Sequence, residues 1–118
     1  MAVTYPILSL VSESTTPDQT GNGQSMLGVG GTQALSANGR YVVFTSEATD
    51  LLAGGNSAGN IFVRDLETGT VTLVSVGTEA ANNVSSLASI SDDGRYVVFR
   101  SSASNLVAGD TNGSDDIF

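Results

Sequence analysis

The chain has 118 residues, a formal net charge of −8, and no cysteine, histidine, lysine or tryptophan. This composition excludes disulfides, thiolate or histidine zinc sites and catalysis by histidine. The acidity disfavours contact with phosphate backbones, and no apolar run approaches the length of a membrane helix, so we expect neither a nucleic-acid nor a membrane partner.

Short apolar runs separated by polar, glycine-rich stretches predict an all-β fold. The chain contains 14 glycines, and its apolar runs are only four to six residues long. Such runs are typical of short strands bounded by turns. No segment holds the i, i+3, i+4, i+7 spacing of apolar residues that an amphipathic helix requires. We therefore expect almost no helix.

The expected strands follow one another regularly. The first, 7–12, comes after Pro6, which lacks an amide proton and suits a strand start or a sheet edge. The strand 41–46 begins with four apolar residues, so both of its faces must be covered, as in a central strand of a stacked sheet. The other strands are expected at 33–36, 61–66, 70–76, 84–90, 96–101 and from 116 onward.

Tight turns and long loops alternate between these strands. Ala37-Asn38-Gly39 and Asp92-Asp93-Gly94 contain residues that tolerate positive φ, as tight hairpins require. Because neighbouring strands are expected to be antiparallel, the tight turns meet at one edge and the long loops at the other. Binding residues commonly lie on such loops. The long, polar loops are 13–31, 47–60, 77–83 and 102–115.

One segment occurs twice. LSANGRYVVFTS at 35–46 returns as ISDDGRYVVFRS at 90–101, with eight of twelve positions identical and an offset of 55 residues from Tyr41 to Tyr96. Self-similarity of this kind is typical of repeat architectures. The repeating unit is a sheet of four antiparallel strands.

The repeated unit resembles a known family. The strings SANGRYVVFTS, IFVRDLETGTVTLVS and NLVAGDTNGSDDIF resemble the WD-repeat-like blades of TolB-type β-propellers, and the resemblance covers nearly the whole chain from residue 33. It implies a toroid, often six-bladed, that commonly serves as a binding scaffold. In such propellers the full ring lies in one chain, whereas this sequence accounts for two blades.

The blade count predicts self-assembly. Segment 33–76 makes one full blade, 84–118 makes a second blade without its outer strand, and strand 7–12 is expected to complete the blade of a neighbour. The expected fold is therefore two four-stranded antiparallel propeller blades per chain, one of them circularly permuted. Three copies would close a six-bladed β-propeller, and four copies an eight-bladed one. Such a self-assembling chain would fit a designed or reconstructed fragment. The alternative is that the sequence is an excised fragment of a natural single-chain propeller.

An oxygen-rich stretch near the end of the sequence is the candidate metal site. Oxygen-bearing side chains separated by a glycine resemble the first half of a calcium loop, although the glutamate at its twelfth position is missing. The alternative is a turn in which Asp and Asn side chains bond their own backbone. The candidate ligands are Asp110, Asn112, Ser114, Asp115 and Asp116.

No residue set predicts catalysis. Asp92 and Asp93 are explained by a hairpin turn, and the segments 33–36 and 84–90 contain no acid for a glycosidase channel. Arg40, Arg64 and Arg95, which lie beside the turns, are expected to pair with nearby carboxylates. We thus expect a non-enzymatic, self-assembling scaffold without a catalytic residue. The alternative is a calcium- or glycan-binding module that uses the long-loop face. Against glycan binding, the long loops lack the tryptophan and tyrosine typical of lectins. The sequence identifies neither a small-molecule or glycan ligand nor a cellular compartment.

Overall fold

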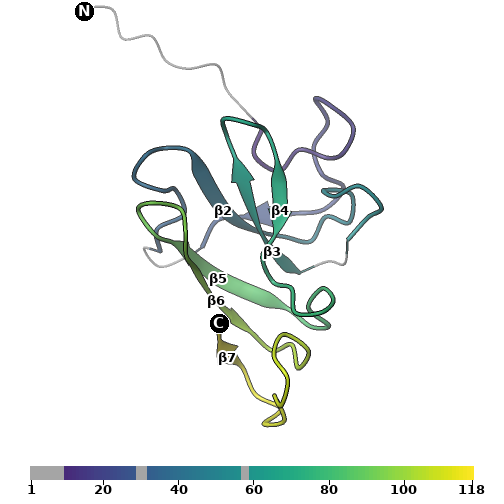
Figure 1. Ribbon diagram of the computed structural model, residues 1–118. Coiled ribbons are helices and arrows are strands. Elements are labelled where there is room, and N and C mark those ends of the chain that lie inside the picture. Colours follow the sequence, from purple (N-terminus) through teal and green to yellow (C-terminus); the bar gives the residue numbers. More distant parts are fainter. Residues whose placement is uncertain (1–9, 29–31, 57–58) are drawn as a thin grey trace, which may run out of the picture.

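The computed structural model describes residues 10–28, 32–56 and 59–118, and this part of the chain is all-β (Figure 1). It forms two antiparallel sheets, which confirms the expected class. The first has the order β1-β2-β3-β4, with β1 Ser25–Met26, β2 Tyr41–Ser46, β3 Asn60–Asp65 and β4 Val71–Leu73. The second has the order β5-β6-β7, with β5 Ser85–Ile90, β6 Val97–Ser101 and β7 Asp116–Ile117. Within these described ranges there is no helix that could cross a membrane.

Strand β2 is central, as its apolar sequence predicts. It pairs with β1 on one side and with β3 on the other. Its side chains alternate between the two faces of the sheet, and both faces are covered: Val43 is 0% exposed and Phe44 is 2% exposed. A strand buried on both faces requires a second layer on each side.

The strand expected at 33–36 is reduced to a single bridge, between Leu35 and Val42. The strand that pairs with the far end of β2 is instead β1, which lies inside the expected loop 13–31. Ser25 has no apolar signature, but its hydroxyl lies 2.8 Å from the hydroxyl of Ser46 across the pair. The strand at this position is therefore joined to β2 by a polar contact, and its own sequence is not an apolar run.

In the second sheet the strand that corresponds to the segments 25–26 and 33–36 is the single strand β5. Strand β5 pairs with β6 along its length, with a bulge between Ser86 and Ser89 where Leu87 has a φ of 54°. A bulge interrupts the pairing locally and bends the strand.

The remaining expected strands agree with β2, β3, β6 and β7 to within about a residue, whereas β4 ends at Leu73 and not at 76. Residues 7–9 of the expected strand 7–12 lie outside the described residues, and residues 10–12 are not in a strand.

The main core lies between the two sheets. Val43 and Ile61 of the first sheet pack against Ala88, Ile90 and Phe99 of the second. All five side chains are at most 6% exposed. This contact fixes one face of each sheet against the other.

A second apolar cluster lies on the opposite face of the first sheet. Phe44 and Phe62 pack there against Ala48 and Leu51 of the loop that follows β2, and Val11 is half-buried beside them. The loop thus folds back over its own sheet, since β2 and β3 present apolar side chains on this face too.

The two sheets have the same aromatic pair. The rings of Phe44 and Phe62 are stacked with centroids 5.7 Å apart and planes at 26°, and the rings of Phe99 and Phe118 have the same distance and angle. Phe99 and Phe118 also exchange both backbone hydrogen bonds. Stacked pairs of this kind contribute beyond their buried area.

The recurring hairpin has a specific hydrogen-bond pattern. The Ser36 hydroxyl donates to Oδ1 of Asn38 and accepts from the Tyr41 amide, while Oδ1 of Asn38 also accepts from the Arg40 amide. These bonds satisfy the polar groups of the turn and explain why Ser and Asn or Asp recur there. The same bonds link Ser91, Asp93, Arg95 and Tyr96 in the second sheet.

Replacing Phe62 by alanine tests the role of the aromatic pair. Phe62 is 0% exposed, so Phe62→Ala should lower the free energy of unfolding by about 3–5 kcal/mol. Val107→Ala, at an exposed position, should change it by no more than about 0.5 kcal/mol. Urea denaturation measures both, and equal losses would contradict the assigned core.

Candidate functional site

The tight hairpins and the long loops lie at different edges of the sheets, as expected (Figure 1). The hairpin before β2 bonds to the hairpin before β6 through the Ala37 amide and the Asp92 carbonyl, 2.9 Å apart. At the other edge, the Ser85 amide donates to the Gly59 carbonyl at 2.8 Å and joins the loops of the two sheets. We call this second edge the long-loop edge; its described segments are 13–24, 47–56, 59, 77–84 and 102–115.

An asparagine holds each pair of long loops together. The Asn22 amide donates to Oδ1 of Asp50 at 2.9 Å, and Oδ1 of Asn22 accepts from the Thr49 amide at 2.8 Å. Nδ2 of Asn22 donates to the Thr49 hydroxyl. Sequence reasoning missed these residues, because a lone asparagine in a polar loop gives no signal; its recurrence before each repeat could have indicated them.

The second sheet has the equivalent asparagine clamp. The Asn82 amide donates to Oδ1 of Asn105, Oδ1 of Asn82 accepts from the Ser104 amide, and Nδ2 of Asn82 donates to the Ser104 hydroxyl. Much of the polar chemistry of the long-loop edge is thus used to hold the loops themselves.

The candidate calcium residues are divided between two directions. Asp110, Asn112 and Asp116 line a hollow of about 440 Å³ at the long-loop edge. Asp115 instead forms an ion pair with Arg100 of β6, whose Nε lies 2.8 Å from Oδ2 of the carboxylate. The structure therefore brings three of the five candidates to one hollow.

Hydrogen bonds within the stretch are those of a turn. Nδ2 of Asn112 donates to Oδ2 of Asp116 at 2.9 Å, and Oδ1 of Asn112 accepts from the Ser114 amide at 2.8 Å. The second bond closes an Asx turn. Among the described residues no three acidic side chains are grouped so that they could hold a metal. These contacts favour the turn over the calcium loop.

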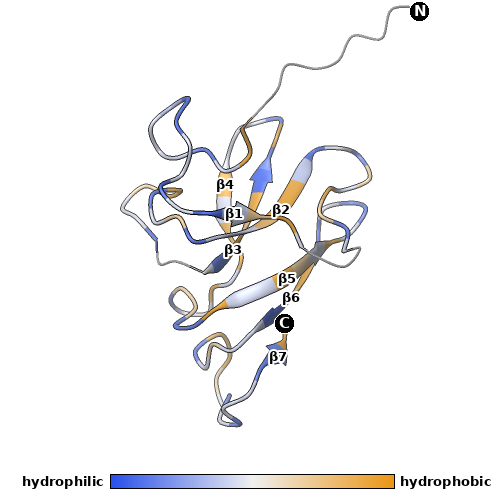
Figure 2. Ribbon diagram, turned by 180° about the vertical axis from the view of Figure 1, so that it is seen from behind, coloured by the Kyte–Doolittle hydropathy of each residue, from blue (hydrophilic) through white to orange (hydrophobic). Residues whose placement is uncertain are grey.

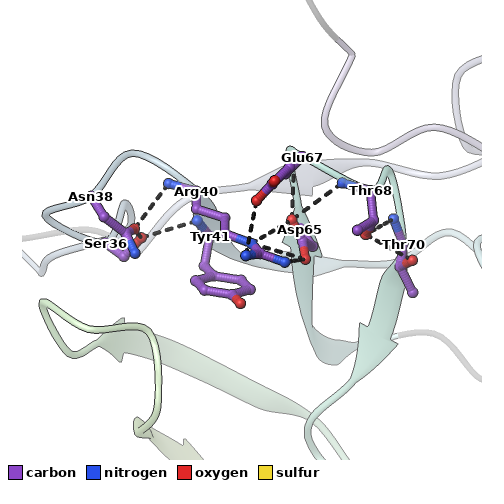
Figure 3. A network of polar contacts seen from close by, with 8 residues as sticks. All are labelled: Ser36, Asn38, Arg40, Tyr41, Asp65, Glu67, Thr68 and Thr70. Atoms are coloured by element: carbon purple, nitrogen blue, oxygen red, sulfur yellow. Dashed lines mark hydrogen bonds and ion pairs between the residues drawn. The ribbon is translucent and has the colours of Figure 1, made fainter.

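A charged cluster joins the hairpin before β2 to the end of β3 and the β3–β4 turn (Figure 3). Nε and an Nη of Arg40 donate to the carboxylate of Asp65 at 2.7–3.1 Å, and the other Nη lies 2.8 Å from Oε2 of Glu67. Oδ1 of Asp65 also accepts from the backbone amides of Glu67 and Thr68. The Arg40 guanidinium holds the pKa of Asp65 well below its ordinary value, and the two amides lower it further.

Arg64 forms a second ion pair, with Glu13 at 2.8 Å. The pKa of Glu13 is lowered first by the hydrogen bond from the Asp18 amide and then by Arg64. The expectation that Arg40, Arg64 and Arg95 pair with carboxylates is confirmed for Arg40 and Arg64. Among the described residues Arg95 forms no such ion pair, whereas Arg100, which was not singled out, does. Asp93 of the second hairpin accepts hydrogen bonds from the Ser91 hydroxyl and the Arg95 amide, and these bonds lower its pKa.

The outer surfaces of both sheets are apolar, as the count of two blades predicts. The first sheet has a hollow of about 450 Å³ whose lining includes Met26, Leu27, Leu35, Val42, Phe44 and Leu66. On the second sheet, Tyr96, Val98 and Ile117 are 65%, 53% and 70% exposed. Figure 2 shows the apolar residues of β2 and β7. Exposed apolar surface of this kind marks interaction sites.

No family model, curated protein or solved structure matches the chain. The resemblance to TolB-type propellers therefore stays an expectation, and any function has to be argued from the contacts described above.

The Arg40–Asp65 pair predicts an acid-sensitive stability. Because the pKa of Asp65 is lowered by folding, its contribution is complete above its unfolded pKa of about 3.9 and is lost as the pH falls through the folded value. Asp65→Asn should be less stable at pH 7 and should lose less stability than the wild type below about pH 4. Thermal melts at pH 7 and at a series of pH values below about 4 measure this. The exposed Glu79→Gln is the control, and an unchanged acid slope in Asp65→Asn would contradict the assignment.

The turn at 110–116 predicts no specific calcium site. We expect about 1 mM calcium to leave the melting temperature unchanged and to give the same calorimetric heat with wild type and Asp110→Ala. Saturable heat that Asp110→Ala abolishes would contradict the turn and restore the calcium hypothesis.

Proposed function

We propose that the chain is a non-enzymatic scaffold that assembles head to tail with copies of itself into a closed ring. The observation that carries the proposal is the apolar outer surface on both sheets. Each Å² of apolar surface that leaves water stabilises the particle by about 25 cal/mol, so burial of both faces is favoured. Because the two surfaces differ, the contact is heterologous, and a heterologous contact that closes makes a ring.

The edge of the second sheet supports the same proposal. In the first sheet β3 pairs with β2 and with β4, whereas among the described residues β7 pairs with β6 alone. An unpaired strand edge is a template for another strand. A strand supplied by a neighbouring copy would give β7 the pairing that β3 has.

The start of the described chain supports the neighbour as the source of that strand. The Gly21 amide donates to the Ser12 carbonyl as the Ala81 amide donates to the Ser75 carbonyl, each at 2.9 Å. Val11 and Ser12 thus precede the first sheet as Val74 and Ser75 precede the second. Strand β4, the last strand of the first sheet, ends directly before Val74. By the same correspondence, we assign the segment before Val11 as the last strand of the neighbour's second sheet, consistent with the expected strand 7–12.

The contacts of the carboxylates support a scaffold and not an enzyme. Asp65, Asp93 and Asp115 bond to arginines, hydroxyls or backbone amides that hold turns and strands. The expected ring has three copies and six sheets, following the six-bladed resemblance; a ring of four has eight. Calcium or glycan binding at the long-loop edge is not favoured by a specific contact.

The mass of the particle tests the proposal. Light scattering after size exclusion should give three times the chain mass of 12.0 kDa. A four-fold mass would support the larger ring. A monodisperse monomer would contradict self-assembly and would point to further sheets of a longer chain as the cover for these faces.

A charge in the apolar outer face should break the particle. Val98 and Val107 are both 53% exposed, but Val98 lies on β6 and Val107 on the long-loop edge. Val98→Asp should lower the assembled fraction at least about tenfold, because it places a carboxylate in a dry contact. Val107→Asp is the matched control and should assemble like the wild type; equal assembly of both variants would count against the assigned face.

A further inference from the structure

The contact between the two sheets includes the ring of Tyr41 packed directly on Gly94. Tyr41 of β2 packs against the hairpin turn of the second sheet, where a Cβ atom at Gly94 would lie 2.2 Å from Cδ2 of the ring. Gly94 also has a φ of +72°. Glycine is therefore required there both by the backbone and by the ring that lies on it.

The same two elements recur on the outside of the molecule without contacting each other. Tyr96, the counterpart of Tyr41, is 65% exposed. Gly39, the counterpart of Gly94, has a φ of +71°, and no atom lies within 4 Å of a Cβ built there. Arg40 and Arg95 lie over Tyr41 and Tyr96, with 5.1 and 5.8 Å to the ring centroids, so the two tyrosines are held in a similar way.

The apolar residues around them follow the same correspondence. In the internal contact Val43 and Ile61 of the first sheet face Ile90 and Phe99 of the second. The counterparts of the first pair are Val98 and Ile117, which are exposed on the second sheet.

The counterparts of the other pair lie at the opposite end of the molecule. Leu35 corresponds to Ile90 and Phe44 to Phe99, and both line the hollow of the first sheet. Each outer surface therefore carries one half of a contact whose two halves already meet inside the chain.

We propose that neighbouring copies dock in the register of the internal contact, with Tyr96 of one copy packed on the Gly39 turn of the next. This inference rests on the proposed self-assembly and names the residues that set its geometry. The internal contact also includes the bond from the Ala37 amide to the Asp92 carbonyl. In the docked pair, the Asp92 amide of one copy donates to the Ala37 carbonyl of the next.

A second copy is the occupant because the internal contact shows what fits these surfaces. An unrelated partner has no reason to match both ends of the chain. A copy matches both, since its two ends are the counterparts of sheets that already pack together. The glycine at position 39 then has a role beyond its turn: it leaves room for a ring.

Two variants test the register, with a matched control. Gly39→Asn keeps a residue type that tolerates positive φ but adds a side chain under the ring; Tyr96→Ala removes the ring from an exposed position that the fold does not need. Gly54→Asn adds the same side chain at a φ of +87° with nothing within 4 Å. We expect Gly39→Asn and Tyr96→Ala to raise the dissociation constant of the particle at least about tenfold, and Gly54→Asn to leave it unchanged.

Sedimentation equilibrium measures these constants, with circular dichroism to check the fold. If the wild type is monomeric, the proposed function fails and the register with it. If the wild type assembles and Tyr96→Ala assembles equally well, self-assembly stands and the Tyr96–Gly39 register is overturned. Because Tyr96→Ala decides this outcome alone, the test holds even if Gly39→Asn does not fold.

Discussion

Burial on both faces of the central strand is the constraint on which the rest of the structure depends. Val43 and Phe44 are adjacent on β2 and point to opposite faces, and both are almost fully buried. One face is covered by the second sheet, and the other by Ala48, Leu51 and Val11. That cover is incomplete, since Met26, Leu27 and Leu35 remain about half exposed beside it, so the sheet still presents apolar surface to water. The second sheet repeats the pattern, and its outer face, with Val98 and Ile117 exposed, needs a covering layer as well.

Short polar side chains give the sheets their precise pairing. Ser46 and Ser101 occupy equivalent ends of β2 and β6, and each hydroxyl accepts from the amide two residues later, Ala48 or Ala103, at 3.0 Å. The asparagine clamps then join the loops that follow. Because buried polar groups must be bonded, these small networks set the course of each loop where apolar packing is thin.

The parts of the fold that sequence reasoning predicted are those with apolar runs or hairpin residues. Strands β2 and β6 begin with an apolar run, and the Gly39 and Gly94 turns have the residues that positive φ requires. Strand β1 was missed because Ser25 and Met26 read as part of a polar loop, and its pairing is decided by β2. The oxygen-rich stretch was found, but which way Asp115 turns depends on Arg100, a residue of another strand. Spacing alone does not contain that information.

The two sheets also show how the scaffold absorbs changes in chain length. Phe44 and Phe62 are 18 residues apart and Phe99 and Phe118 are 19 apart, yet the ring pairs have the same geometry. Likewise, ten residues separate Ser25 from Leu35 where five separate Ser85 from Ile90, and both segments reach the same pairing. Insertions at these places leave the frame unchanged, so they are natural positions for evolutionary divergence and for grafting foreign peptides.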